Sequence, residues 1–226
     1  MVSQVADNDQ AGAIGACECD KCTAARKRDG GTGLTYEGGQ SGLSLSAAND
    51  MAAALASEFP DVLVNMQSYQ DKLEPPRVTR AHPSVRIQFT TMVSALPAPV
   101  SQNLRLESDQ MKMQGQNFGR PLRSGGNTEA NMTRDQFIEW TTIAPGQVTL
   151  WDYSCNFVYP FLLLPNWLKL GDDVKFYRER NVSGVMMEAC DGWQPPDLHE
   201  MRVWMLSQLC LNFEESFIVS SQQFFD

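Results

Sequence analysis

Two short apolar stretches of the sequence each end on a carboxylate, and this pair is the first candidate for chemistry. Val148–Tyr153 carries Asp152 near its end, and Gly184–Cys190 carries Glu188. Each stretch has the length and composition of a buried strand, and the order strand, loop, helix, strand is the repeating unit of a parallel sheet. Ligands of α/β proteins bind beyond the carboxyl ends of such strands. We therefore expect Asp152 and Glu188 to flank a ligand site.

Paired carboxylates of this kind are what glycoside hydrolysis requires. One carboxyl group protonates the leaving oxygen, and a second acts as nucleophile or activates water. Glu188 follows two methionines, and an apolar setting would raise its pKa and suit a general acid. Its partner would be Asp152 or Asp9, which follows a predicted strand at residues 2–6. The alternative is that these carboxylates cap loops or form ion pairs with arginines.

Three cysteines gather in the sequence Cys17-Glu18-Cys19-Asp20-Lys21-Cys22. Three thiolates in a short loop could hold zinc, with a fourth ligand from elsewhere in the chain. The chain has two histidines, and their spacing supports neither a second metal ligand pair nor a Ser-His-Asp or Cys-His catalytic pattern. The alternatives for the cysteines are reduced buried thiols or a disulfide with one cysteine left over.

The elements that would position these residues follow from hydrophobic periodicity, which predicts an α/β chain of alternating strands and helices. The predicted strands are 2–6, 62–69, 85–89, 148–153 and 184–190, and the predicted helices are 45–59, 133–141, 172–180, 197–209 and 213 to the end. No glycine-rich phosphate loop follows a strand, which disfavours a nucleotide-binding open sheet. Parallel strands are covered on both faces, which agrees with the apolar runs at 148–153 and 184–190.

Two polar segments are predicted to be loops. A loop is expected around Cys17–Cys22, followed by the polar, glycine-rich residues 26–42, which read as a loop or a mobile insert. Residues 93–131 are rich in Gln, Ser, Gly, Asn and Pro. A loop as long as 93–131 is either a lid or a disordered insert. We expect one domain over residues 1–226, with this insert inside it.

Composition narrows the classes of partner. The 226-residue chain has a net charge of −9 and no cluster of basic residues, which argues against nucleic acid as the main partner. No apolar run approaches the roughly 20 residues that span a bilayer, so no membrane partner is expected. The first residues do not read as a secretory signal, and the cysteine number does not fix the compartment.

Aromatic and amide side chains near the carboxylates are candidates for binding a sugar, because aromatic faces stack on sugar rings. The alternative for the aromatic residues is core packing. The candidate substrate-binding residues are Trp151, Tyr153, Asn156, Trp193, Tyr69 and Asn8.

A set of residues along most of the chain matches one family in the same order. They are Asn8-Asp9, Cys17, Cys19 and Cys22, Tyr69 with Pro75-Pro76, Trp151-Asp152-Tyr153, Asn156-Phe157, Pro165-Asn166, Gly184-Val185 ending on Glu188, and Leu198 through Trp204. In these residues the chain resembles a domain of unknown function from large glycoside-hydrolase-like proteins, found beside modules of the alpha-glucuronidase and hexosaminidase kind. The chain departs from that family in its long segment 93–131 and in lacking a cysteine and a histidine soon after the third strand.

The resemblance implies a (β/α)8 barrel, of which this chain would be the C-terminal five-strand portion. It also implies a carbohydrate partner and a secreted or cell-surface location. Five strands of a barrel leave two open edges, so we expect the chain to need the missing N-terminal half or to associate with itself. The leading hypothesis is a glycosidase-like domain acting on a glycan or uronide. The alternatives are a barrel that binds glycans without cleaving them and a zinc-stapled structural domain.

Overall fold

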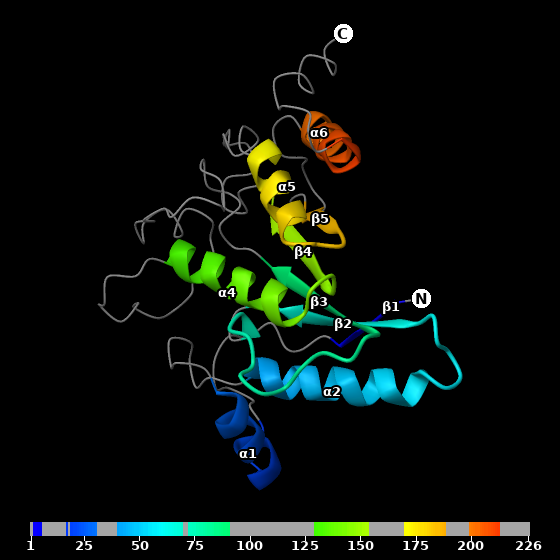
Figure 1. The fold of residues 1–226 in the computed structure, drawn as a ribbon, viewed down its shortest axis with the longest axis vertical. Helices are drawn as coiled ribbons and strands as arrows, with labels where there is room; N and C mark the ends of the chain where they lie inside the picture. The colour runs from blue at the N-terminus through cyan, green and yellow to red at the C-terminus, as the bar shows by residue number, and fades with distance from the viewer. Residues whose placement is uncertain are drawn as a thin grey trace. The chain divides into compact units, whose positions relative to one another are not determined.

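The computed structural model describes residues 2–5, 17, 19–30, 40–69, 72–90, 129–153, 170–188 and 199–212 (Figure 1). The elements in chain order are β1 (Val2–Val5), α1 (Asp20–Asp29), α2 (Gln40–Leu55), β2 (Leu63–Ser68), β3 (Val85–Thr90), α4 (Glu129–Ile143), β4 (Val148–Tyr153), α5 (Leu170–Glu179), β5 (Val185–Glu188) and α6 (His199–Leu211). They fall into two compact units. The first comprises 1–90, 136–150 and 182–184, and the second comprises 91–135, 151–181 and 185–226.

The first unit contains a parallel sheet whose strands follow one another in sequence order. The strand order is β1-β2-β3-β4-β5, and β1 through the first half of β4 belong to this unit. β1 pairs with β2, and β2 with β3, in parallel. The N–H of Ile87 donates to the carbonyl of Gln147 (2.9 Å), and the N–H of Leu150 donates to the carbonyl of Gly184 (2.9 Å). Consecutive strands in a parallel sheet need a crossover connection, and α2 supplies the one between β1 and β2.

The core of the first unit lies between this sheet and its helices. α2 runs along the sheet and packs mainly on β2 (Figure 1). The phenyl ring of Phe89 on β3 meets that of Phe137 on α4, with centroids 5.5 Å apart. The indole N–H of Trp140 donates to the carbonyl of Leu73 (2.8 Å). Other fully buried apolar side chains of this core are Leu45, Ala48, Ala52, Val64, Met66, Val85, Ile87, Ala144, Val148 and Leu150.

β3 alternates between apolar and polar residues. Its residues Val85, Ile87 and Phe89 are buried, whereas Arg86 and Gln88 between them are half-buried. Successive side chains of a strand point to opposite faces. The apolar set faces the helices, and the polar set forms a second, hydrophilic face.

α1 corrects the predictions of a loop around Cys17–Cys22 and of a loop or mobile insert over residues 26–42. The residues Asp20–Asp29 include good helix formers, with Asp20 in the first turn and three basic residues in the last, which suits the helix dipole. Hydrophobic periodicity missed this helix because it buries only Asp29. α2 likewise starts at Gln40 and ends at Leu55, so it begins earlier and ends earlier than the predicted helix 45–59. α4 starts at Glu129, four residues before the predicted start.

The second unit packs α5 against α6. Leu170 and Val174 of α5 and Leu209 of α6 form a buried cluster, with Met187 of β5 and Leu206 against it. This apolar stripe follows the i, i+4 spacing that the sequence shows. The predicted helix from 213 to the end, and residues 93–128 of the predicted insert, lie outside the described residues.

These findings confirm the α/β class with a parallel sheet and flanking helices. The assignment to part of a (β/α)8 barrel stays a prediction. Among the described helices, none combines the length and the apolar character that crossing a membrane requires.

Candidate metal centre

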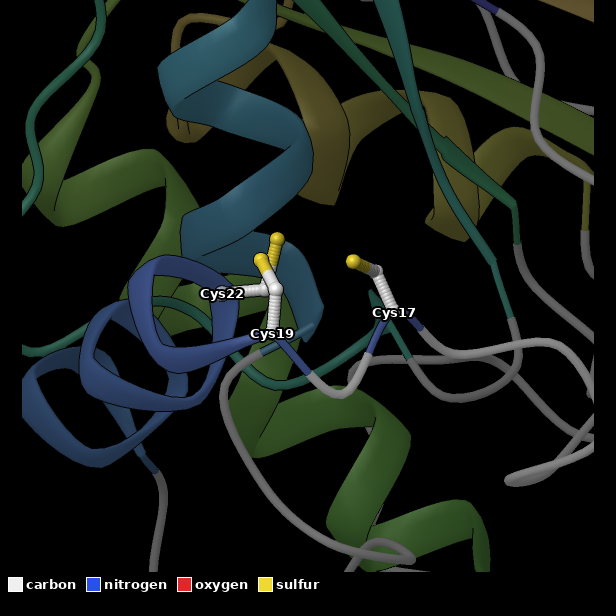
Figure 2. A group of neighbouring side chains, drawn as sticks. All are labelled: Cys17, Cys19 and Cys22. Atoms are coloured by element: carbon white, nitrogen blue, oxygen red, sulfur yellow. The ribbon is translucent and has the colours of Figure 1, made fainter.

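The three cysteines at 17, 19 and 22 come together at the start of α1. Cys19 is the residue that caps the helix, with φ −62° and ψ 155°, and Cys22 lies in the first turn. All three sulfurs lie within 4.8 Å of one another. Figure 2 shows the Cys19 and Cys22 sulfurs side by side and the Cys17 side chain facing them from the preceding segment. Cys17 and Cys19 are exposed and Cys22 is half-buried, so the cluster is accessible to solutes.

Local hydrogen bonds keep this turn in place. The guanidinium of Arg26, one helical turn beyond Cys22, donates to the carbonyl of Cys17 (2.8 Å) and so holds the preceding segment against α1. The N–H of Thr23 donates to the carbonyl of Cys19 (3.0 Å), which closes the first turn. The helix that starts between Cys19 and Cys22 thus brings the three cysteines of this short sequence together as a thiol cluster.

The far end of α1 is anchored by a buried carboxylate that the sequence analysis missed. Asp29 is fully buried, and its Oδ1 accepts the N–H groups of Val78 (3.0 Å) and Thr79 (2.7 Å). Its Oδ2 accepts from the Thr79 hydroxyl (2.7 Å) and from Arg28 (2.6 Å). Burial raises the pKa of Asp29, but these hydrogen bonds outweigh it and leave the pKa below the ordinary value. No sequence signal links Asp29 to a pair of residues fifty positions away.

Within the cluster, the pKa values of the Cys19 and Cys22 thiols are shifted in opposite directions. The pKa of Cys19 falls to about 7, chiefly because the backbone of Cys22 stabilises its thiolate, with help from the Cys17 and Cys22 thiols. The pKa of Cys22 rises to about 11, chiefly because its own thiol donates to Cys19. A helix N-terminus is known to favour a thiolate. The lowered pKa of Cys19 therefore favours its thiolate near neutral pH, before any metal binds.

The donor set fits a thiophilic metal ion. Tetrahedral zinc with Zn–S bonds of about 2.3 Å holds its sulfurs about 3.8 Å apart, so an inward movement of about 1 Å would complete three bonds. Among the described His, Cys, Asp and Glu residues, the group consists of these cysteines alone. A fourth ligand would be water or a residue outside the described ranges, where Cys155 and Cys190 lie.

The predicted catalytic carboxylates are only partly described. Asp152 lies on β4 and is buried, with 2% of its surface exposed. Its charge, with that of Asp173 on α5, adds to the effect of burial in raising the pKa of Tyr177 well above its usual range. Asp152 is therefore close to the α5 side chains in the second unit. Glu188 is the last residue of β5, and its side chain lies outside the description, as does Asp9.

The predicted substrate-binding residues are likewise incompletely described. Trp151 on β4 and Tyr69 after β2 are half-buried, and Tyr153 ends β4. Asn8, Asn156 and Trp193 lie outside the described residues. The structure thus brings the three cysteines together and leaves the carboxylate pair and its aromatic partners as a prediction.

The hydrophilic sheet face of the first unit is a second feature that the sequence analysis missed. Asn65 of β2 is in register with Arg86 of β3, and Gln67 with Gln88. The Asn65 amide donates to the Gln88 amide oxygen (3.1 Å). Thr90, at the end of β3 on the same face, is fully buried, and its hydroxyl has no hydrogen-bond partner. The alternation Val-Arg-Ile-Gln-Phe at 85–89 was the sequence signal for this face.

Comparison with known proteins places the chain in a family whose role is not defined. No curated protein and no solved structure matches it. A family profile matches the chain over residues 1–226, and its description is a domain of unknown function. The resemblance to a family of that kind is confirmed, whereas its glycoside-hydrolase-like nature stays a prediction. Because the match covers the full sequence, the chain belongs to the DUF4838 family of domains of unknown function.

Proposed function

We propose that the chain is a metal-binding domain in which Cys17, Cys19 and Cys22 hold one zinc ion. The observation that carries this proposal is the approach of the three sulfurs to within 4.8 Å at the start of α1. Zinc–thiolate bonds contribute directly to folding where they join segments that pack little against the core. α1 fits that case, because Asp29 is its one buried residue.

The metal would act as a staple at the amino end of α1. Asp29 anchors the carboxyl end of the helix to residues 78–79, whereas the amino end has the Arg26–Cys17 bond. Zinc would bind the helix and the segment before it to one point. The thiols must lose their protons to bind, so binding would release protons and strengthen as pH rises.

Zinc content of single-cysteine variants tests this proposal. The reduced full chain is loaded with zinc, freed of excess by gel filtration, and analysed by elemental mass spectrometry. We expect one zinc per chain, and a loss of most of it in Cys17→Ser, Cys19→Ser and Cys22→Ser. Cys210→Ser is the matched control, because Cys210 is an exposed thiol on α6 outside the cluster, and it should bind as the unmodified chain does. Equal zinc in all four variants would overturn the proposal.

A second candidate function is action on a glycan, and the hydrophilic sheet face favours it. Amide, guanidinium and hydroxyl groups of the kind found at Asn65, Gln67, Arg86, Gln88 and Thr90 are what sugar hydroxyls bind. A polar face on a parallel sheet is also what a barrel lined for a polar ligand would present. In this proposal Glu188 is the acid, with Asp152 or Asp9 as its partner, and the domain belongs to a secreted or cell-surface protein.

Hydrolysis of a panel of aryl glycosides and glycuronides tests the glycan proposal. The longer parent protein, if the chain is part of one, is compared with its Glu188→Gln variant. Turnover that disappears in the variant would support a glycosidase. Sugar binding without turnover, lost in Trp193→Ala, would support the non-catalytic binding module. If neither turnover nor sugar binding is observed, both forms of the glycan proposal are overturned, and the metal proposal is unaffected.

A further inference from the structure

Cys19 and Cys22, at the start of α1, have the spacing of a dithiol that can close on itself. Cys19 caps the helix, and Cys22 follows three residues later in its first turn. Side chains at i and i+3 lie on one face of a helix with their Cβ atoms about 5–6 Å apart. A disulfide needs its Cβ atoms about 3.5–4.5 Å apart and its Cα atoms about 4.4–6.8 Å apart. A movement within one turn is enough to bring the pair to that geometry.

We infer that Cys19 and Cys22 form a reversible disulfide that removes two of the three metal ligands. This regulation rests on the proposed zinc site, because without zinc the disulfide has no metal to exclude. It turns the thiol cluster into a site with two alternative states, one reduced and metal-bound, the other oxidised and metal-free.

The oxidant we name is a low-molecular-weight disulfide such as glutathione disulfide. The Cys19 thiolate attacks one sulfur of that disulfide, which forms a mixed disulfide and releases one glutathione thiolate. Cys22 then loses its proton to solvent, and its sulfur attacks the Cys19 sulfur and releases the second glutathione thiolate. Two protein thiols are oxidised to one disulfide, and one glutathione disulfide is reduced to two thiols after protonation.

Exposure and position assign the order of these steps. Cys19 is exposed and precedes the first helical residue, so a solute reaches it first. Cys22 is half-buried behind it and within reach. Cys17 belongs to the preceding segment, whose carbonyl Arg26 binds, and closing a disulfide from it would require that segment to move. The structure therefore favours the 19–22 pair over either pairing with Cys17.

The oxidised state should exclude zinc because one remaining thiolate is a poor site on its own. Tight structural sites use four protein ligands, and the disulfide would leave Cys17 and whatever group supplies the fourth position. In turn, bound zinc occupies both sulfurs and should slow oxidation. The two processes are therefore mutually exclusive and linked.

Peptide mapping tests the disulfide directly, because Lys21 lies between the two cysteines. Trypsin cleaves after Lys21 and so separates a peptide with Cys17 and Cys19 from one that begins at Cys22. The metal-free full chain is incubated with glutathione disulfide, excess thiol is blocked, and the digest is analysed by mass spectrometry. We expect the two peptides to be joined, and dithiothreitol to part them.

Variants identify the pair and separate this inference from the metal proposal. Cys17→Ser should still give the joined peptides although its zinc is lost, Cys22→Ser should give none, and Cys210→Ser should match the unmodified chain. Zinc-loaded protein should react at least several-fold more slowly and release its zinc as the peptides become joined. If zinc binds but no 19–22 disulfide forms, the inference fails and the metal site stands. If the disulfide forms in a chain that never binds zinc, the metal proposal fails, and with it the regulatory role.

Discussion

Gly42 of α2 lies directly against Asp29 of α1, and a methyl group there should destabilise the protein. A Cβ added at Gly42 would lie 2.3 Å from the Cβ of Asp29 and 2.6 Å from its Cγ. Non-bonded carbon atoms prefer about 3.5–4.0 Å. In Gly42→Ala, α1 and α2 must therefore move apart by about 1 Å or more at this point.

Three contributions determine the expected change in the free energy of unfolding of Gly42→Ala. Overpacking of this kind costs about 1–3 kcal/mol. Moving α1 also strains the Asp29 bonds to the N–H groups of Val78 and Thr79, and one buried donor left without its partner costs about 1–3 kcal/mol. Alanine is favoured over glycine inside a helix by about 1 kcal/mol, which offsets part of the loss. The expected net loss of unfolding free energy is about 3 kcal/mol.

Urea unfolding followed by circular dichroism measures this loss. With a slope of about 2–3 kcal/mol per molar urea, the midpoint should fall by about 1 M. Ala47→Ser on the exposed face of the same helix also adds one heavy atom, and it should stay within about 0.5 kcal/mol of the unmodified chain. A Gly42→Ala protein as stable as the Ala47→Ser control would refute the close packing of α1 on α2.

Three further predictions follow from the charges and edges of the fold. Asp29 has a lowered pKa in the folded chain, so its contribution to stability is present above the unfolded pKa of about 3.9 and is lost as the pH falls below that value. The urea midpoint of Asp29→Asn should be lower than that of the unmodified chain at pH 7 but should fall less between pH 5 and pH 3. Parallel pH curves for the two proteins would contradict the assignment. The pKa of about 7 at Cys19 predicts that, in the reduced, metal-free chain, iodoacetamide modifies Cys19 at a rate that rises through neutral pH. Cys22, with a pKa of about 11, should react slowly until strongly alkaline pH. Equal modification rates at the two cysteines, read by peptide mapping, would contradict the difference between their pKa values. If the chain is an incomplete barrel, its open strand edges should make it associate, so sedimentation velocity should show oligomers or aggregates, and a sharp monomer boundary with cooperative melting would count against the barrel.

The sequence predicted the helices and strands that have a strong apolar period, and it failed to predict an element that is stabilised by tertiary contacts of a polar side chain. β2, β3 and β4 lie within one residue of their predicted bounds, because buried strands must be apolar at every second position at least. α1 was missed because its stabilising contact is a carboxylate, Asp29, whose partners come from a distant loop. A helix of this kind carries no apolar stripe for periodicity to detect.

The same distinction holds for the candidate sites. The spacing of Cys17, Cys19 and Cys22 gave the thiol cluster directly, since residues this close in sequence cannot lie far apart. The pairing of Asp152 with Glu188 depends on how two strand ends meet, which local sequence does not fix. The proximity of Asp152 to Asp173 and Tyr177 could not be predicted from the sequence either. The i, i+4 spacing on α5 places Asp173 and Tyr177 on a shared helix face but does not say which residues pack against that face.

X-ray absorption spectroscopy at the zinc edge of the loaded, reduced chain shows directly whether the cysteine sulfurs bind the metal. We expect three sulfur ligands at about 2.3 Å and one further ligand, with the sulfur signal reduced in Cys17→Ser and unchanged in Cys210→Ser. A zinc ion surrounded only by nitrogen and oxygen atoms at about 2.0–2.2 Å, or a sulfur signal that Cys17→Ser leaves intact, would contradict it.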